Sequence, residues 1–300
     1  MSKTISAEKA IRTIVRSHIE TYATTFSERH LRELNEPDGT LNMKIHNVFK
    51  KIIFGIKMNF EKYNISNGNS VELIKTLPNN SVDLILTDPP YNIGNYSTGN
   101  IKLKWRKNIN NDLAEWDTIE FNPNEWVNEF LRILKPTGNI FAFTSYNLIG
   151  KWHEAFDKEF DTFQFMVWHK TNPAPKIYKA GFLNSCELII CCWNKGHTWN
   201  FISQKDMHNF IESPICMGSE RLKEPSHPTQ KPLKILKKII EFASNPEDIV
   251  FDPFMGVGST GVAALEMNRK FVGFELEESY FNAAQKRIEQ NTKINQLVLA

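Results

Sequence analysis

The sequence predicts an α/β protein built on a doubly wound, mostly parallel sheet. From Asn64 onward, short apolar runs of strand length alternate with helix-length stretches. This alternation is typical of parallel sheets that are covered by helices on both faces. Near the C-terminal end, a short strand, a Gly-rich turn, a helix and a second strand follow one another directly. That order is typical of a ribose-binding α/β unit.

A helical segment precedes the α/β region. Residues 7–33 are predicted to form a helix, because their apolar side chains recur every three or four positions and mark one buried face. A turn with Pro and Gly follows at residues 35–39, and then a basic amphipathic stretch runs to Lys57. We find no catalytic motif in this segment.

The elements of the α/β region follow in chain order. Strands are expected at residues 63–69 (with a turn), 82–87, 140–144, 163–168, 185–193, 249–251 and 270–274. Helices are expected at residues 70–77, 126–134, 152–160 and 234–243, and from Val262 onward. The helix over 126–134 should end at the Lys-Pro-Thr-Gly sequence that follows it, because Pro breaks a helix.

Composition indicates a globular protein without a membrane anchor. Hydrophobic residues make up 41% of the chain and charged residues 23%. No apolar run approaches a membrane span, and the first residues lack the apolar core of a signal peptide, so we expect a cytoplasmic protein. The net charge is only +2, so any charge that binds nucleic acid must be local. Metal-ligand spacing is absent from the four cysteines, which we expect to be reduced thiols: Cys186, Cys191, Cys192 and Cys216.

An unusual motif follows the apolar run over residues 82–86. It consists of Thr87, Asp88, Pro89, Pro90 and Tyr91. The prolines fix φ and remove backbone donors, so the strand must end here and nearby carbonyls stay free to accept hydrogen bonds. Asp88 adds a carboxylate acceptor and Tyr91 adds a flat face, which together predict a pocket for a planar group bearing an NH2. For this motif alone, a strand followed by a Pro-rich turn with an incidental Asp stays open.

A second motif begins at Asp252. A short apolar strand runs into the Gly-rich turn Asp252–Gly261, a helix starts at Val262, and the next strand ends on Glu275. Glycines let the backbone approach a ligand closely, and a terminal acid accepts hydrogen bonds from ribose hydroxyls. An Asp-Pro-Phe sequence precedes the glycines, which distinguishes this turn from a dinucleotide-binding site.

The two motifs resemble those of the S-adenosylmethionine-dependent amino-methyltransferases of DNA, which methylate the exocyclic amine of adenine or cytosine. In that family Asp-Pro-Pro-Tyr is the catalytic motif, and Asp-Pro-Phe-x-Gly-x-Gly-Ser/Thr is the cofactor motif. A third match, His-Pro-Thr-Gln-Lys-Pro at residues 227–232, is similar to the family's segment upstream of the cofactor strand. The order of the motifs resembles the circularly permuted β group, over residues 63–290. The resemblance implies a permuted Rossmann-like methyltransferase domain over residues 58–300, after an N-terminal helical extension over residues 1–57.

The resemblance also implies the catalytic roles. Asp88 and the carbonyl of Pro89, which precedes Pro90, would each accept a hydrogen bond from one N–H group of the target amine. Tyr91 would stack on the base. The target base would be flipped out of the duplex, since its amine lies inside the stack. Methyl transfer would be direct, and no metal is required.

Cofactor binding is implied for a larger set of residues. Glu275 would bind the ribose hydroxyls, and Lys231 would be available to the carboxylate of the amino-acid end. Asn69 stands where the family often carries an Asp that contacts the cofactor adenine, which weakens that expectation. The remaining candidates are Asp252, Phe254, Gly256, Gly258, Ser259, Thr260, Thr229 and Gln230.

Two stretches are candidates for contacting double-stranded DNA. Residues 92–117 form a candidate mobile loop after the catalytic motif, and residues 194–226 correspond to the family's target-recognition region. Each contains basic residues, and an ordinary solvated loop stays open for the first. The candidate DNA-binding residues are Lys102, Lys104, Arg106, Lys107, Arg221 and Lys223.

The function predicted from these motifs is a site-specific DNA adenine-N6 methyltransferase of a restriction-modification or orphan system. In the permuted group the cytosine-N4 enzymes tend to carry Ser in place of the first acid, so Asp88 favours adenine. Cytosine-N4 methylation, methylation of RNA or a protein amide, and a catalytically idle DNA-binding module stay open. So do a homodimer and a separate cognate restriction endonuclease. The expected setting is bacterial, archaeal or phage-encoded, at the nucleoid.

Overall fold

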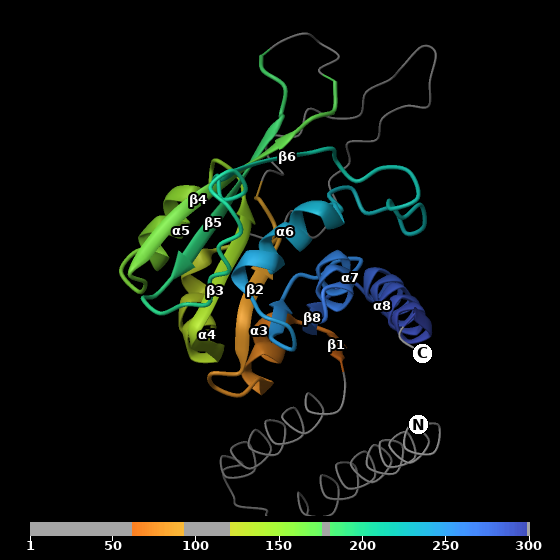
Figure 1. The fold of residues 1–300 in the computed structure, drawn as a ribbon, viewed down its shortest axis with the longest axis horizontal. Helices are drawn as coiled ribbons and strands as arrows, with labels where there is room; N and C mark the ends of the chain where they lie inside the picture. Colours follow the sequence, from red (N-terminus) through yellow and green to blue (C-terminus); the bar gives the residue numbers. More distant parts are fainter. Residues whose placement is uncertain (1–61, 93–120, 176–180, 299–300) are drawn as a thin grey trace, which may run out of the picture.

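An eight-stranded sheet organises the described part of the chain (Figure 1). The structure is a computed structural model that describes residues 62–92, 121–175 and 181–298, with side chains as far as residue 292. The expected N-terminal extension and most of the loop over residues 92–117 lie outside these ranges. The strands are β1 Tyr63–Asn67, β2 Val82–Thr87, β3 Leu134–Thr144, β4 Thr162–Lys170, β5 Cys186–Trp193, β6 Phe210–Ser213, β7 Ile249–Asp252 and β8 Lys270–Glu275. They stand in the order β1-β8-β7-β2-β3-β5-β4-β6.

Most neighbouring strands run parallel, which confirms the predicted fold class. Among the strands of the described ranges, only β5 pairs antiparallel, with β3 on one side and β4 on the other. The other ladders are parallel. The carboxyl ends of β2, β7 and β8 therefore lie at one edge of the sheet, and the reversal at β5 brings its first residues to that same edge.

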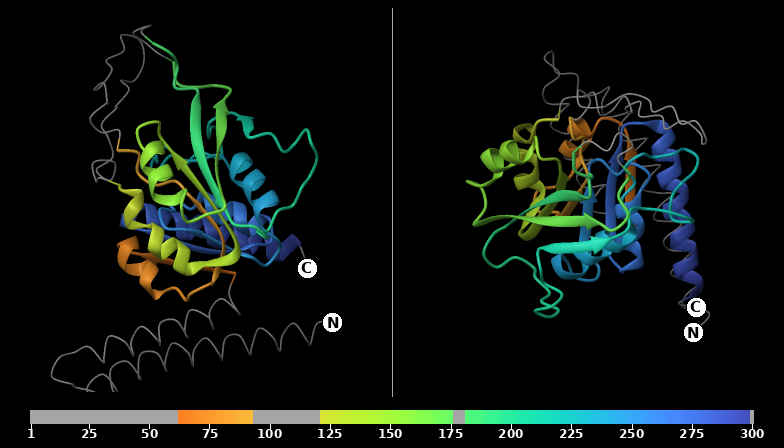
Figure 2. Two further views of the ribbon diagram at one scale, coloured as in Figure 1. Left: turned by 90° about the vertical axis from the view of Figure 1, so that its left-hand side faces the viewer. Right: turned by 90° about the horizontal axis from the view of Figure 1, so that it is seen from above.

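Helices cover both faces of the sheet (Figures 1 and 2). One face packs on the 3-10 helix η1 and the helices α4 and α5, and the other packs on α6, α7 and α8. Side chains alternate between these two layers along each strand: Ile85 and Phe251 face the first, and Leu84 and Val250 face the second. The helical bounds are α3 Ser70–Leu73, η1 Ile74–Thr76, η4 Pro123–Glu125, α4 Val127–Ile133, α5 Ile149–Phe156, α6 Leu233–Ala243, α7 Ser259–Glu266 and α8 Glu278–Val298.

Several bounds differ from the sequence prediction. β3 begins at Leu134, the last residue of the predicted helix, and runs through the predicted turn; its register against β2 shifts between Val82 and Leu84. The Pro-containing segment is accommodated at this irregularity, since Pro supplies no ladder hydrogen bond. Helix α7 begins at Ser259, immediately after Gly258 in the left-handed conformation (φ 77°). Burial of its first turn outweighs the low helix propensity of the Ser-Thr-Gly sequence there.

Besides the 3-10 helix η4, two elements have no counterpart in the prediction. The short strand β6 pairs with β4 inside the region predicted to be irregular. Helix α8 is mostly polar and contributes only a few side chains to the core, among them Ala284 and Ile288. None of the helices in the described ranges combines the length and apolarity needed to cross a bilayer.

Candidate active site

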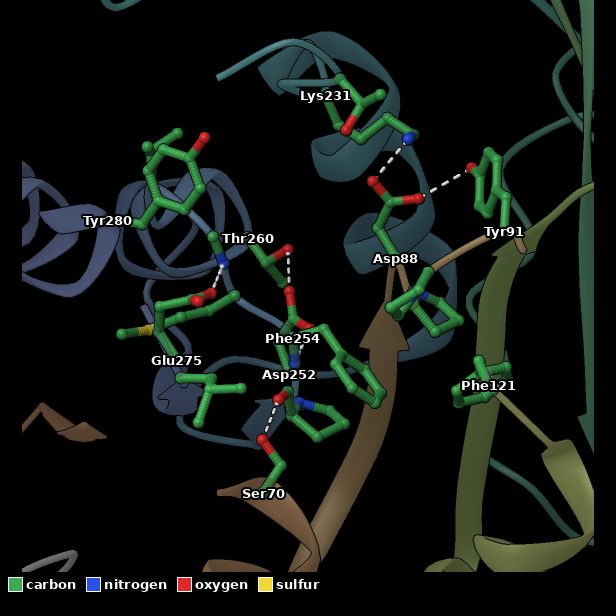
Figure 3. A pocket seen from close by; sticks show the side chains of 18 of the residues that line it. Ser70, Asp88, Tyr91, Phe121, Lys231, Asp252, Phe254, Thr260, Glu275 and Tyr280 are labelled. Carbon is green, nitrogen blue, oxygen red and sulfur yellow. Dashed lines mark hydrogen bonds and ion pairs between the residues drawn. The ribbon is translucent and has the colours of Figure 1, made fainter. Parts of the chain in front are cut away.

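A cavity of about 280 Å³ opens at the edge where the parallel strands end (Figure 3). Loops after β2, β7 and β8 form it, together with the segment before α6. Most residues predicted from the sequence line it: Asn69, Asp88, Pro89, Pro90, Tyr91, Thr229, Gln230, Lys231, Asp252, Phe254, Gly256, Ser259, Thr260 and Glu275. Residues that the sequence analysis did not single out also line it, among them Ser70, Phe121, Trp126, His227 and Tyr280.

Asp88 lies at one end of this cavity, directly after the fully buried strand β2. Its Oδ1 accepts a hydrogen bond from the Tyr91 hydroxyl at 2.7 Å, and its Oδ2 pairs with the Lys231 ammonium at 2.5 Å. The pKa of Asp88 is raised, because burial outweighs the favourable effect of Lys231. The carboxylate therefore depends on its cationic partner to stay ionised.

Lys231 faces Asp88 rather than the far end of the cavity. Its side chain is only 5% exposed, and its ammonium also lies 3.4 Å from Glu187 and 5.2 Å from the centre of the Tyr91 ring. Burial lowers the pKa of Lys231, but Asp88 and Glu187 outweigh it and raise that pKa above its ordinary value. The charged form of Lys231 is thus the stable one.

Glu187 is a member of this cluster that the sequence analysis missed. Its Oε2 accepts a hydrogen bond from the Tyr91 hydroxyl at 3.1 Å, and its Oε1 pairs with Lys170 at 2.6 Å. Burial would raise the pKa of Glu187, but Lys231 and Lys170 outweigh burial and lower it. The signal in the sequence was a charged residue near the start of an apolar strand, which becomes informative only once β5 is known to run antiparallel.

The Tyr91 ring packs against the second core layer, with its hydroxyl turned toward Asp88 (Figure 3). Its backbone carbonyl accepts hydrogen bonds from Ser145 and Asn147, each at 3.1 Å. Burial and the two nearby carboxylates hold the pKa of the Tyr91 hydroxyl well above 10, so Tyr91 is a neutral donor.

Asp252 uses its carboxylate to build the Gly-rich turn. It accepts hydrogen bonds from the hydroxyls of Thr87 (2.8 Å) and Thr260 (2.7 Å) and from the amide of Phe254 (3.0 Å). Burial raises the pKa of Asp252 to about 7. The contacts fix the turn between β7 and α7, so Asp252 and Thr260 support the cavity wall as well as lining it.

Gly256 and Gly258 occupy different environments. Gly256 (φ 51°) lines the cavity and donates its N–H to Glu275 Oε2 at 2.8 Å, and a Cβ there would lie 3.0 Å from His227 Nε2. Gly258 lies outside the lining, and a Cβ there would lie 3.0 Å from Ala284 of α8. Gly258 therefore permits close packing of α7 and α8 rather than an approach to the cavity.

The opposite end of the cavity is built around Glu275. Its Oε1 accepts a hydrogen bond from the amide of Glu277 at 2.8 Å, and burial raises its pKa. Asn69 caps α3 by accepting a hydrogen bond from the amide of Val71 at 2.9 Å, and Ser70 donates to the carbonyl of Pro253 at 2.5 Å. These contacts fix the loop after β1 against the Gly-rich turn.

Three aromatic rings form one wall of the cavity. The Phe254 ring centre lies 4.9 Å from that of Trp126 and 5.7 Å from that of Phe121. A wall of this kind suits a flat heterocycle, which stacks on aromatic faces. Phe121 and Trp126 were missed as site residues because they lie on a loop and at a helix start, without a motif.

The segment before α6 closes the remaining side. Gln230 donates to the carbonyl of Glu220 (2.8 Å) and accepts from the amide of Leu222 (3.0 Å), so its amide anchors a neighbouring loop. Burial lowers the pKa of His227 to about 4, and its ring lies 4.7 Å from that of Tyr280. The imidazole is therefore neutral at ordinary pH.

Two of the candidate DNA-binding residues, Arg221 and Lys223, belong to the described part of the chain. Arg221 is half-buried and Lys223 is exposed, and neither lines the cavity. The four basic residues at 102–107 lie outside the described residues. Among the described side chains, no group of three His, Cys, Asp or Glu residues could hold a metal ion.

Comparison with known proteins identifies the family. A family model described as DNA methylase, covering N6 and N4 enzymes, matches residues 82–286. The type II methyltransferase M.HinfI of Haemophilus influenzae is 33% identical over 251 residues, covering 75% of this chain and 68% of that protein. The type II methyltransferase M2.DpnII of Streptococcus pneumoniae is 30% identical over 254 residues, covering 79% of this chain and 93% of that protein.

Solved structures agree with this result. The complex of M1.HpyAVI with S-adenosylmethionine superposes with a TM-score of 0.54 at 29% identity, covering 75% of this chain and 99% of that one. The PvuII DNA methyltransferase, which is cytosine-N4-specific, gives a TM-score of 0.56 at 19% identity, covering 80% and 93%. The second likeness concerns the fold alone. The chain thus belongs to the N6/N4 DNA methylase family and is a DNA methyltransferase that uses S-adenosylmethionine.

Proposed function

We propose that the protein methylates the N6 amine of adenine at a specific site in duplex DNA. The observation that carries this proposal is Asp88, which ends β2 at the cavity and is paired with Lys231 at 2.5 Å. A carboxylate at this position is the acceptor that an exocyclic amine needs. Cytosine-N4 methylation is the alternative within the family, and the acid at position 88, where the cytosine enzymes of the permuted group tend to carry Ser, favours adenine.

The chemistry follows from the weakness of the nucleophile. The lone pair of an adenine amine is delocalised into the ring, so the nitrogen must become pyramidal before it attacks. Asp88 accepts a hydrogen bond from one N–H group of the amine, and the carbonyl of Pro89 accepts a hydrogen bond from the other. Both hydrogen bonds strengthen as positive charge develops on the nitrogen, so they stabilise the transition state more than the ground state.

The cavity suits S-adenosylmethionine in shape and in chemistry. Its volume of about 280 Å³ lies near the lower end of ordinary ligand pockets. The aromatic wall of Phe121, Trp126 and Phe254 holds the adenine ring, and Glu275 accepts hydrogen bonds from the ribose hydroxyls. When bound, the cofactor supplies an activated methyl group on a sulfonium. The protein's contribution is alignment of that methyl with the amine held by Asp88.

Replacing Glu275 with Ala should weaken cofactor binding. Loss of hydrogen bonds to a charged group costs about 1–3 kcal/mol, which corresponds to roughly a 5- to 150-fold increase in Kd. Calorimetric titration with S-adenosylmethionine or its demethylated product measures this. Glu277→Ala, which removes an exposed acid outside the cavity lining, is the matched control. Unchanged affinity in a folded Glu275→Ala variant would mean that the ribose site lies elsewhere.

The target base is flipped out of the duplex into this cavity, because its amine is inaccessible within the stack. The loop over residues 92–117 follows the catalytic motif directly, and residues 194–226 contribute to target recognition. Residues 1–57 form an extension of the catalytic domain over residues 58–300. A homodimer and a separately acting restriction endonuclease are the partners to test.

Single-molecule sequencing of DNA from cells that express the protein reports the methylated base and its sequence context together, and unmodified adenines would count against the proposal.

The basic loop provides a separate prediction. Replacing Lys102, Lys104, Arg106 and Lys107 with Gln should weaken DNA binding evenly across sequences and leave the methylated site unchanged. Each phosphate contact contributes roughly one unit to the slope of log affinity against log salt, so the slope should flatten by about two units or more. The measurement is DNA affinity against salt concentration, with the Arg221→Gln/Lys223→Gln variant for comparison. Parallel slopes for wild type and the quadruple variant would assign the DNA contacts to residues 194–226 or to the N-terminal extension.

A further inference from the structure

Two ion pairs meet behind the catalytic motif. Lys231 lies between the carboxylates of Asp88 (2.5 Å) and Glu187 (3.4 Å), and Glu187 in turn pairs with Lys170 (2.6 Å). The Tyr91 hydroxyl bridges the same two carboxylates, at 2.7 Å from Asp88 and 3.1 Å from Glu187. The side chains of both acids and both lysines are at most 20% exposed.

This arrangement comes from the antiparallel reversal at β5. Glu187 is the second residue of β5 and Lys170 is the last residue of β4, so both lie at the edge where β2 delivers Asp88. Neither Glu187 nor Lys170 lines the cavity. They therefore act on the reaction through Lys231 and Tyr91 rather than through contact with the reacting atoms.

We propose that Glu187 is a positioning residue for methyl transfer: it shares the Lys231 ammonium with Asp88, so that Asp88 keeps acceptor capacity for the target amine. The inference rests on the proposed role of Asp88. If Lys231 had Asp88 as its only anionic partner, ammonium hydrogens would occupy the lone pairs that the amine needs. Glu187 takes up part of the hydrogen-bonding capacity of the Lys231 ammonium, and Lys170 compensates the charge of Glu187. The two carboxylates and the two ammonium groups therefore balance in charge.

The charges predict opposite effects for two substitutions. The titratable groups that face Asp88 are Lys231, Glu187, Tyr91 and, across the turn, Asp252. Lys231 lowers the pKa of Asp88 and Glu187 raises it. Lys231→Met should therefore raise the pKa of Asp88, and Glu187→Gln should lower it. Activity requires ionised Asp88, so the acid limb of the kcat profile should move to higher pH in the first variant and to lower pH in the second.

The test is kcat against pH at saturating DNA and cofactor, combined with a ¹³C NMR titration of the Asp88 carboxyl in the free enzyme. Glu187→Gln should lower the plateau kcat by about tenfold, the loss typical of one charge-assisted hydrogen bond, with KM for the cofactor unchanged. Glu241→Gln is the matched control, because Glu241 pairs with Lys238 (3.5 Å) on α6 outside the cavity lining. Its profile should coincide with that of the wild type.

The outcomes separate this inference from the proposed function. Opposite shifts of the Asp88 titration in Lys231→Met and Glu187→Gln, with the lower plateau in Glu187→Gln, support the inference. Shifts in the same direction, or a Glu187→Gln titration and plateau like those of the wild type, would overturn it. If Glu187→Gln does not fold, Lys170→Met replaces it, because uncompensated Glu187 should draw Lys231 further from Asp88. A raised Asp88 pKa in Lys170→Met then supports the inference, and an unchanged one overturns it. A wild type that methylates no adenine would contradict the proposed function, and the NMR titration would still decide whether Lys231 and Glu187 tune Asp88.

Discussion

Asp88→Ala should abolish methyl transfer while leaving cofactor affinity within a few fold of the wild type. Losing one well-placed acceptor in a transition state typically costs about 3 kcal/mol, or roughly a hundredfold in rate. The loss should be larger here, because the substitution also leaves the buried Lys231 ammonium without its nearest partner. The carbonyl of Pro89 cannot compensate for the lost carboxylate, since it accepts a hydrogen bond from only one of the two N–H groups of the amine.

Asp88→Asn removes the charge of the side chain and keeps its shape, so it separates the two contributions. The amide is a weaker acceptor than the carboxylate and turns a donor toward either the amine or Lys231, so we expect a severe loss of kcat. Single-turnover rates with labelled S-adenosylmethionine measure both variants, and thermal unfolding shows whether each is folded. Near wild-type turnover in either folded variant would remove Asp88 from the mechanism.

Gly256→Val should abolish cofactor binding. The backbone at Gly256 is in the left-handed region (φ 51°), where a β-branched residue is strained by about 1–3 kcal/mol. A Cβ would also lie 3.0 Å from His227 Nε2, and the Val methyls would extend into a site that Gly256 lines. Strain at the turn also disturbs the hydrogen bond from Gly256 to Glu275. We expect cofactor affinity to fall by about a hundredfold or more.

Calorimetric titration with S-adenosylmethionine measures this loss. Gly150→Ala is the matched control, because a Cβ at Gly150 of α5 meets no other atom within 4 Å. Circular dichroism shows whether the fold survives, since strain in the turn lowers stability as well. A folded Gly256→Val variant that binds the cofactor like the wild type would contradict the assignment of the Gly-rich turn to the cofactor.

The fold could be predicted to a large extent because its signals are local. The parallel strands β2, β7 and β8 contain short apolar runs, and the two motifs mark the ends of β2 and β7. The exceptions lack such signals: β6 has four residues, and the polar helix α8 contributes few side chains to the core. The first residues of α7 are poor helix formers that tertiary burial stabilises, which propensity alone does not predict.

The residues of the site could be predicted only where they belong to a recognisable sequence motif. Asp88 and Glu275 stand at strand ends, Gly256 stands in the turn after β7, and the parallel sheet brings strand ends together. Lys231 depends instead on pairings with distant segments of the chain, and Glu187 depends on the direction of β5. Side-chain charges alone do not predict that Lys231 faces Asp88, because a buried lysine pairs with whichever carboxylate the fold places beside it.

The proposed function requires that the acceptor site at Asp88 directs a methyl group to the N6 amine of adenine. Its most direct test is incubation of the purified protein with unmethylated duplex DNA and methyl-labelled S-adenosylmethionine, followed by enzymatic digestion and mass spectrometry of the nucleosides. We predict label in N6-methyladenine, and loss of that label in Asp88→Ala. Label in N4-methylcytosine, or label in N6-methyladenine that persists in folded Asp88→Ala, would contradict the account.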